Sequence, residues 1–263
     1  MNRFLCLLFL AASSLHPASA EPISAQHKQG SMHGFLLVKS PQGKVIAVGE
    51  VVQLAEGVRL HSRLVFHFRD GSLDDETTVL LQRETLTLLR DHHVQKGPEF
   101  PTPLDVTINV PAGEVTWLDT KDGKIEINKR HMELPSDLAN GIIPLVMDNV
   151  RPNVAETKVS YLASAPKPRV VKLSIKPEER ESFTVGDLPF FATRYVMHIE
   201  LGGFAGIIAP MVGKQPLDIH HWVTTGEVPS YVRMQGPFYM GGPVWTVELA
   251  SPLWSHDGKL DRR

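Results

Sequence analysis

The sequence predicts a mainly β protein, a single antiparallel sheet or barrel that carries one short helix. The strongest observation is a period of two in the apolar residues. Between Leu60 and Phe68 every second residue is apolar or small, and most residues between them are charged or histidine. Such alternation is typical of a strand with one buried face. Many further segments have the same character, and turn signals such as Asp70-Gly71 separate them.

One segment, 134–150, has a different pattern. Ser136 is a suitable N-cap, with Asp137 in the first turn. Apolar residues then follow at helical spacing: Leu138, Ile142, Leu145 and Val146. Pro144 would kink or shorten a helix at this place. We therefore expect one short helix between two groups of strands.

The N-terminus of the chain predicts export. The N-terminus combines Arg3, an apolar run and small residues that end in Ala18-x-Ala20, which is the pattern of a secretory signal peptide. The apolar run is shorter than the roughly 20 residues that span a bilayer, so no transmembrane anchor is expected. We predict a signal peptide at 1–20 cleaved after Ala20, a single β-rich domain at 21–255 and a charged tail at 256–263. The mature protein would then be periplasmic or extracellular.

Composition narrows the possible functions. Cys6, the only cysteine, lies in the predicted signal peptide, so the mature chain would have no disulfide, thiolate nucleophile or cysteine-bound zinc. The formal net charge of −2 provides no basic surface for nucleic acid. The sequence contains no G-x-S-x-G, H-E-x-x-H or phosphate-binding glycine motif. We expect no cofactor, and a role without catalysis is favoured.

Histidines are the main candidates for chemistry. His220 and His221 are adjacent, so in a strand they point to opposite faces and cannot both bind one metal without a bulge. Asp218, His220 and Trp222 would share one face, where the carboxylate could orient the imidazole. The favoured alternative is a solvated or hydrogen-bonded strand face.

A second set of polar residues follows one face of the strand at 59–69. Its members are Arg59, His61, Arg63, His67 and Arg69. This stripe could hold an anionic head group, but a solvated outer face balanced by acidic neighbours is favoured, the neighbours being Asp74, Asp75 and Glu76. The adjacent pair His92 and His93 meets the same objection as the first pair. The acidic stretch at 70–78 lacks the ligand pattern of a calcium loop and is interpreted as a hairpin.

The C-terminal third contains FFATRYVMHIELGG followed by HHWVTTGEVPSYVRMQG, a strand with Trp222 and a second strand after Pro229. Together with RDGSLDDETT and LPSDLANGIIPLV, these stretches resemble an uncharacterised secreted bacterial family similar to the lipoprotein-carrier-like half-barrel proteins of the envelope. The resemblance implies a strongly curved sheet whose concave face is covered by one short helix and encloses an apolar cavity. It also implies an apolar ligand, since characterised carriers of this fold bind acyl chains.

These observations predict an exported envelope protein that binds an apolar ligand, a lipid or a lipid-linked group, in the half-barrel cavity. The candidate head-group contacts are His198, Glu200, Asp218 and His220, and the candidate lining residues are Phe190, Phe191, Met197, Phe204, Met211 and Trp222. One alternative is an envelope scaffold that binds a protein partner through its outer surface or sheet edges. A less favoured alternative is a hydrolase or metal enzyme that gathers histidines from separate strands, drawn from His61, His67, His198, His220 and His221.

Overall fold

A computed structural model describes residues 22–121, 124–164, 167–201 and 216–250. The predicted signal peptide and charged tail lie outside these residues. Fourteen strands form one sheet, in the order β8-β7-β6-β5-β4-β3-β2-β1-β14-β13-β12-β11-β10-β9. The strands are β1 (Met32–Lys39), β2 (Val45–Glu56), β3 (Arg59–Phe68), β4 (Leu73–Gln82), β5 (Leu86–Lys96), β6 (Leu104–Asn109), β7 (Glu114–Lys121), β8 (Lys124–His131), β9 (Thr157–Ala163), β10 (Arg169–Val185), β11 (Leu188–Glu200), β12 (Ile219–Thr224), β13 (Tyr231–Gly236) and β14 (Trp245–Leu249). The helix α1 (Ile143–Asn149) lies between β8 and β9 in the chain.

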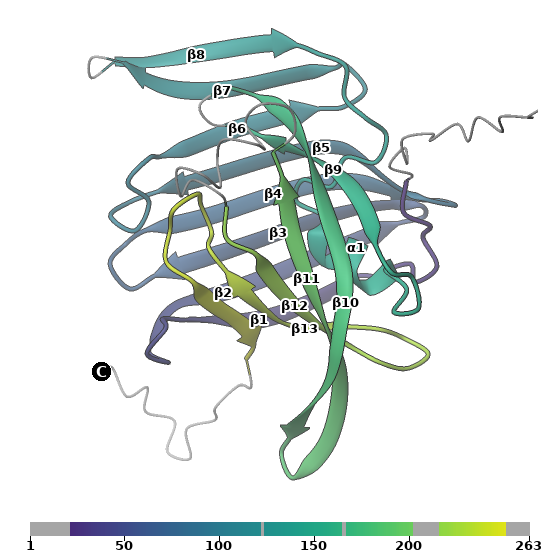
Figure 1. The fold of residues 1–263 in the computed structure, drawn as a ribbon. Helices are drawn as coiled ribbons and strands as arrows, with labels where there is room; N and C mark the ends of the chain where they lie inside the picture. The colour runs from purple at the N-terminus through teal and green to yellow at the C-terminus, as the bar shows by residue number, and fades with distance from the viewer. Residues whose placement is uncertain (1–21, 122–123, 165–166, 202–215, 251–263) are drawn as a thin grey trace, which may run out of the picture.

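The sheet is antiparallel and unclosed. Strands that are consecutive in sequence pair with each other, except β8 and β9, which form the two ends of the strand order. β1 pairs with β14, with Leu36 opposite Leu249, and so joins the two halves. The sheet curls so that β9–β13 cross in front of β1–β6, with α1 between the two layers (Figure 1). We call the face toward α1 the concave face and the opposite face the convex face. The predicted fold class, a single curved antiparallel sheet with one short helix, is confirmed.

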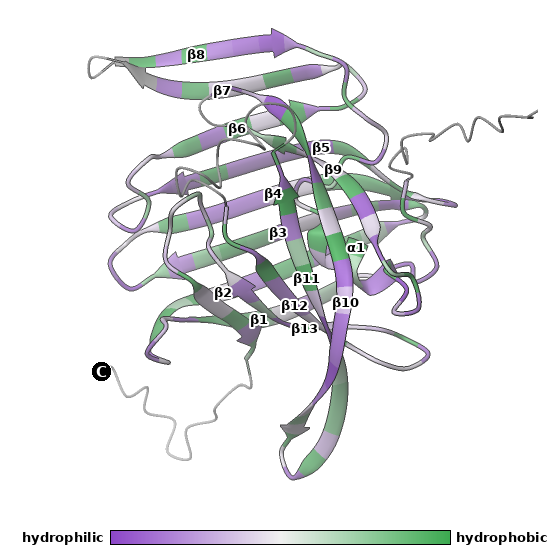
Figure 2. Ribbon diagram, in the orientation of Figure 1, coloured by the Kyte–Doolittle hydropathy of each residue, from purple (hydrophilic) through white to green (hydrophobic). Residues whose placement is uncertain are grey.

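Hydrophobic and hydrophilic residues alternate along many of the strands, as the period of two predicts (Figure 2). The largest apolar cluster surrounds α1 and joins both halves of the sheet. Leu60 and Leu80 contribute from one half and Ile175 and Val223 from the other, while Met147 contributes from the helix. A second cluster is rich in aromatic rings, and we call it the aromatic cluster: Leu36, Val38, Ala47, Phe66, Phe68, Phe100, Trp245 and Val247, with Phe238 packed against it.

The helix is shorter than the sequence predicts, and Ser136 is not its N-cap. It begins at Ile143, with Pro144 in the first turn, where the missing N–H group costs little. The backbone before it pairs with β9 instead. The N–H of Ala139 donates to the carbonyl of Ser160 at 2.9 Å, and the N–H of Ser160 donates to the carbonyl of Asp137 at 3.2 Å. This edge pairing competes with helix formation, because the same backbone groups cannot serve both.

Asn140 extends this pairing with its side chain. Its Oδ1 accepts a hydrogen bond from the N–H of Leu162 at 2.8 Å, and its Nδ2 donates to the carbonyl of the same residue at 3.1 Å. Both bonds are buried. The amide therefore stands in for a neighbouring strand at this position of the β9 edge.

Among the described residues, no helix is long and apolar enough to cross a membrane.

We predict that Asn140→Ala lowers the free energy of unfolding by about 2 kcal/mol, because it leaves the buried N–H and C=O of Leu162 without partners. Urea denaturation followed by circular dichroism measures the change. The matched control is Asn109→Ala, which removes only an exposed bond of 3.4 Å to Ala112. The control should change stability by less than about 0.5 kcal/mol. Equal effects of the two substitutions would contradict the assigned role of Asn140.

Candidate functional site

The predicted head-group residues lie on the convex face. Tyr195 and Met197 pack in the core around α1, so His198 and Glu200, at the alternate positions of β11, point to the other side. His198 Nδ1 lies 2.6 Å from Asp218 Oδ1, and both side chains are nearly half exposed. Glu200 accepts a hydrogen bond from a lysine, Lys158, at 2.6 Å. These groups form ion pairs on an outer surface and do not enter the interior.

Trp222 and His220 share that convex face, as the sequence predicts. Although Trp222 is buried, polar groups surround it: its Nε1 donates to Glu181 Oε2 at 2.9 Å, and the Arg233 guanidinium lies 4.9 Å from its ring centroid. His220 Nδ1 lies 3.6 Å from Glu178 Oε2. These contacts fit the hydrogen-bonded strand face that the sequence analysis favours.

Those predicted apolar lining residues that the structure describes do not gather around one cavity. Phe204 and Met211 lie outside the described residues. Phe190 and Phe191 are exposed near the tip of the β10–β11 hairpin, whereas Met197 is buried in the core. The predicted site therefore separates into a convex surface, a hairpin tip and the packed interior.

The second histidine of the β12 pair lies on the other face, as expected for adjacent residues in a strand. His221 points to the concave face, opposite Tyr195, and is almost completely buried. Its ring centroid lies 6.1 Å from that of Tyr231. Burial, with a smaller contribution from the nearby His220, lowers the pKa of His221 to about 3. His221 is therefore a neutral ring at physiological pH.

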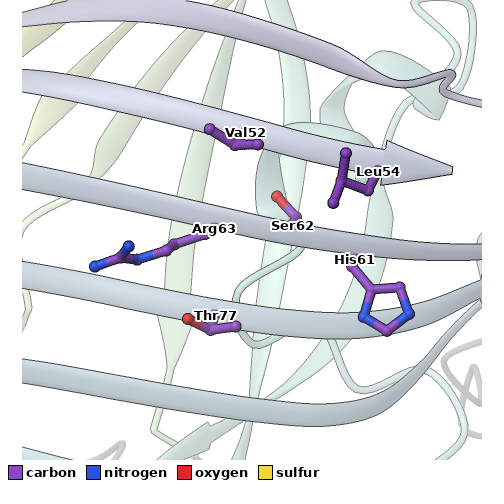
Figure 3. Close-up of a pocket in the computed structure, with 6 residues that line it drawn as sticks. All are labelled: Val52, Leu54, His61, Ser62, Arg63 and Thr77. Carbon is purple, nitrogen blue, oxygen red and sulfur yellow. The ribbon is translucent and has the colours of Figure 1, made fainter.

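The polar stripe on β3 borders a shallow convex hollow of about 230 Å³ (Figure 3). Its lining residues are Val52, Leu54, His61, Ser62, Arg63 and Thr77. Arg63 binds both carboxylate oxygens of Asp75, at 2.9 and 2.6 Å. The paired hydrogen bonds raise the pKa of Arg63 and lower that of Asp75. The Arg63 charge is thus already matched, which favours the solvated outer face that the sequence analysis describes.

The remaining acidic neighbours, Asp74 and Glu76, do not balance this stripe. They alternate with Asp75 along β4 and point to the concave face, where they join a set of polar residues on β2–β5 that we call the inner polar patch. The patch consists of Gln53, Ser62, Asp74, Glu76, Thr78, Asp91, His93 and Gln95. It lies between the core around α1 and the aromatic cluster.

Strand register arranges the inner polar patch in rows. In the first row, Gln53 lies opposite Ser62, Ser62 opposite Thr78, and Thr78 opposite Asp91. All four side chains are buried. The row therefore places four polar groups side by side across β2, β3, β4 and β5.

In the second row Glu76 lies opposite His93, and in the third row Asp74 lies opposite Gln95. His93 therefore lies between two carboxyl groups. His93 Nε2 lies 2.8 Å from Asp74 Oδ1, and its Nδ1 lies 3.8 Å from Glu76 Oε1. Gln95 Nε2 donates to Asp74 Oδ2 at 2.9 Å and to the carbonyl of Phe238 at 3.1 Å. The last bond ties the patch to the loop that packs on the aromatic cluster. Asp74 is thus fully engaged, whereas Glu76 is not.

The protonation of this patch follows from its burial. Burial raises the pKa of Glu76, and burial together with the charge of Glu76 raises that of Asp91 well above its ordinary range. For His93, burial lowers the pKa, but the charge of Glu76 and the hydrogen bond to Asp74 outweigh it and raise the pKa to about 10. Burial, and then the Glu76 charge, raise the pKa of Tyr161 on β9. His93 is therefore an imidazolium at neutral pH, and the Tyr161 phenol across the interior is neutral.

Three oxygens of the first row are buried without a hydrogen-bond partner among the described residues: Gln53 Oε1, Thr78 Oγ1 and Asp91 Oδ1. Folded proteins leave few such atoms unpaired, and each one calls for an explanation, such as a bound water or ligand. The patch reaches solvent mainly at Glu76 and His93, whose side chains are 19% and 16% exposed. Within the described residues, no group of three metal-ligating side chains is arranged to hold a metal ion.

Gly141 covers part of this row at close range. Its φ of +65° is a conformation that residues with a Cβ rarely adopt. A Cβ at this position would lie 2.1 Å from Thr78 Cγ2 and 2.6 Å from Asp91 Oδ1. The segment that pairs with the β9 edge therefore also closes one side of the inner polar patch.

Apolar side chains lie beside the ionisable ones in the second row. There Val51 lies opposite Leu64, Leu64 opposite Glu76, and Glu76 opposite His93. Val51 and Leu64 are only partly buried although they point to the concave face. Met234 on β13 is likewise partly buried and packs beside the aromatic cluster. This arrangement can bind a polar group at the carboxylates and an apolar group beside it.

A further buried carboxylate, Asp148, lies on α1. Burial raises its pKa to about 7, against the opposing effect of a hydrogen bond from the backbone of Tyr231. Gln29 Nε2 donates to its Oδ2 at 3.3 Å. Burial, and then the Asp148 charge, raise the pKa of the Tyr231 phenol. The sequence analysis assigned no role to Asp148. It treated Asp74 and Glu76 as counter-charges of the β3 stripe and did not group them with His93. The available signal was that β4 has polar residues on both of its faces.

We predict that His93→Gln flattens the pH dependence of stability above neutrality. The folded protein binds the His93 proton more tightly than the unfolded chain, because the pKa rises from 6.5 to about 10 on folding. This contribution is complete below about pH 6.5 and is lost as the pH rises toward about 10, at no more than about 1.4 kcal/mol per pH unit. Urea denaturation between about pH 7 and pH 9 should give a falling stability for the native sequence and a flatter profile for the variant. Identical slopes would show that His93 is not an imidazolium.

We predict the corresponding effect of Asp148→Asn in a lower pH range. The folded pKa of about 7 exceeds the ordinary value of 3.8, so folding favours the protonated carboxyl, and stability falls as the pH rises from about 4 to about 7. The variant retains an acceptor for Gln29 but has no proton to lose. It should exceed the native protein in stability by about 1–3 kcal/mol at about pH 8 and match it near pH 4. A difference between the two proteins that is the same at both pH values would contradict this prediction.

No family model matches the chain, and no curated protein matches it in sequence. Among solved structures, the chain is similar to the crystal structure of a beta-barrel-like protein of the domain of unknown function DUF1849 from Brucella abortus. The sequence identity is 7% and the TM-score is 0.45, and the alignment covers 86% of this chain and 99% of the other. No residue role is transferred at this level of similarity, and the comparisons show no relation to lipoprotein carriers.

Proposed function

We propose that this chain is an exported, non-enzymatic envelope protein that binds an amphiphilic ligand, a lipid or lipid-linked group, on the concave face of its sheet. The observation that carries the proposal is the first row of the inner polar patch. Gln53, Thr78 and Asp91 each present a buried oxygen that has no hydrogen-bond partner among the described residues. Partly buried apolar side chains, Val51 and Leu64, lie in the adjoining row.

The chemistry of the patch restricts the head group. Its unpaired atoms are a carboxyl, an amide and a hydroxyl oxygen, all of which accept hydrogen bonds. The cation of the patch, His93, is already bound to Asp74. A carboxylate or phosphate head group would add negative charge beside Glu76 and Asp91, whose raised pKa values show that negative charge is already disfavoured in this poorly solvated place. We therefore infer a head group that donates hydrogen bonds: an amide, a hydroxyl or an amine.

The position of the ligand follows from the order of polar and apolar side chains along the concave face. The polar head group would lie at Glu76 and Asp91, close to the covering backbone of Gly141. The apolar part would extend along Leu64 and Val51 toward the aromatic cluster. His198, Glu200, Asp218, His220 and Trp222 lie on the opposite face of the sheet and are not part of this proposal.

The enzyme alternative has less support. A general base must be unprotonated near the working pH, and the raised pKa keeps His93 protonated. His61, His198 and His220 lie on the convex face, and His221 is a buried neutral ring on the other face. The histidines are thus dispersed between the two faces of the sheet. A binding role uses the burial of the patch directly, without any proton transfer.

The first experiment is native mass spectrometry of the chain purified from its own host without detergent. The expected spectrum shows a protein that begins at Glu21 and carries an added mass that denaturation releases and organic solvent extracts. An N-terminus at Met1 would contradict export by a cleaved signal peptide. A chain at its bare sequence mass would count against a retained ligand, and the displacement assay below then tests binding directly.

We predict that Glu76→Gln weakens ligand binding at least about tenfold, because it replaces an acceptor oxygen of the carboxyl group by an amide NH2, and a lost buried hydrogen bond costs more than about 1.4 kcal/mol. Displacement of the fluorophore phenylnaphthylamine by dodecylamine, dodecanol and dodecanoate measures the affinity. For the native sequence, the amine and the alcohol should bind more tightly than the carboxylate.

The matched control is Asp75→Asn, one residue away on the convex face of the same strand. It should leave all three affinities unchanged, although it breaks the ion pair with Arg63. If Glu76→Gln and Asp75→Asn affect binding equally, or if dodecanoate binds best, the inner polar patch is not the head-group site.

A further inference from the structure

The two edges of the unclosed sheet differ. The β9 edge is covered by the backbone of residues 137–139 and by the Asn140 side chain. The outer edge of β8, at the other end of the strand order, pairs with no strand among the described residues. β8 also exposes two large apolar side chains, Ile125 at 70% and Ile127 at 74%. An uncovered edge with apolar side chains is a template for pairing with another chain.

The faces of β8 are set by its pairing with β7. Trp117 packs against the core around α1 and lies opposite Asn128, so Asn128 belongs to the concave side. Glu126 and Arg130, at alternate positions, share that side. Ile127 lies opposite Leu118 on the convex side. The free edge therefore has a charged face and an apolar face.

The sequence KIEINKRH of β8 is self-complementary about Asn128. In an antiparallel pair of identical strands related by a two-fold axis, each residue lies opposite the residue equally far on the other side of the axis. With the axis at Asn128, Glu126 of each copy lies opposite Arg130 of the other copy. The axis thus generates two equivalent ion pairs, with the two Asn128 side chains between them.

Other registers lack this complementarity. The axis must pass through a residue. An axis between two residues would shift the register by one residue and place a concave side chain opposite a convex one. An axis at Glu126 brings the two Glu126 carboxylates together, and an axis at Lys129 brings the two Lys129 ammonium groups together. An axis at Ile127 forms no ion pair and places Lys124 opposite Arg130. Among these registers, the one centred on Asn128 alone pairs opposite charges.

The apolar face agrees with the same register. With the axis at Asn128, the two copies of Ile127 become diagonal neighbours across the new strand pair, within reach of each other. Lys129, which would lie opposite Ile127, is held by Glu114 at 2.6 Å on the neighbouring strand. Its aliphatic part can therefore cover Ile127 while its charge stays matched. Pairing covers apolar surface that the single chain leaves exposed.

We propose that two copies of this chain associate through antiparallel pairing of β8 about a two-fold axis at Asn128, which joins the two sheets into one. The inference does not depend on the proposed function, since it uses neither the inner polar patch nor a ligand. One strand of eight residues makes a small interface. We expect a weak, reversible dimer, as is typical of interfaces below the standard size.

Sedimentation velocity of the mature chain over a series of concentrations tests the proposal. Glu126→Arg should weaken dimerisation at least about tenfold, because the two-fold axis repeats the loss of an ion pair and the gain of a like-charge pair. Arg130→Glu should have the same effect. The double variant Glu126→Arg with Arg130→Glu restores opposite charges in the same register and should recover most of the dimer.

Thermal unfolding shows whether each variant is folded, which matters because Arg130 also donates to the carbonyl of Pro168 at 3.3 Å. Phe190→Ser changes the exposed tip of the β10–β11 hairpin and should leave the dimer intact. A native chain that stays monomeric at all concentrations overturns the proposal. So does a dimer that is insensitive to the single charge reversals, that the double variant fails to restore, or that Phe190→Ser abolishes.

Discussion

The burial of α1 between the two halves of one unclosed sheet is the interaction on which the rest of the structure depends. A sheet that carries apolar side chains on one face must cover that face, and here it does so by curling over the helix. Leu145, Val146 and Met147 are almost completely buried and belong to the same cluster as residues from both halves. Because α1 has only seven residues, it covers only part of the concave face. The inner polar patch lies on that face, beyond the core that surrounds the helix.

The patch has a cost that its internal contacts only partly offset. Three carboxyl groups are removed from water, and the two whose pKa values are raised, Glu76 and Asp91, show that the surroundings favour their protonated forms. His93 offsets one negative charge through its contact with Asp74. The unpaired oxygens of Thr78 and Asp91 have no such compensation. A fold under selection for stability alone would fill these positions with apolar side chains, which is why we attribute the patch to ligand binding.

The local pattern predicted the strands and the residues that share a face of each strand, but not which face of the sheet is concave. The alternation along β3 was sufficient to separate the buried Leu60 from the exposed Arg63, and it placed His220 and Trp222 together. It did not show which face is concave, because that depends on how distant strands curl. On β4 the residues from 74 to 78 are polar at every position, so the pattern contains no apolar face from which to infer an inside. The inner polar patch emerges only from the register of β2–β5, and the helix start at Ile143 only from the pairing of the preceding backbone with β9.

The segment at 137–142 joins three features that the sequence shows as separate. Its backbone and Asn140 complete the β9 edge, which protects one end of the sheet from pairing with other chains. The next residue, Gly141, presses the backbone onto Thr78 and Asp91 and closes one side of the patch. Two residues later α1 begins. A shift of this segment would therefore uncover the edge, open the patch and displace the helix together. One side of the patch is closed by the same contacts that stabilise the fold, whereas β8, which no strand of the described part of the chain covers, is the edge open to association.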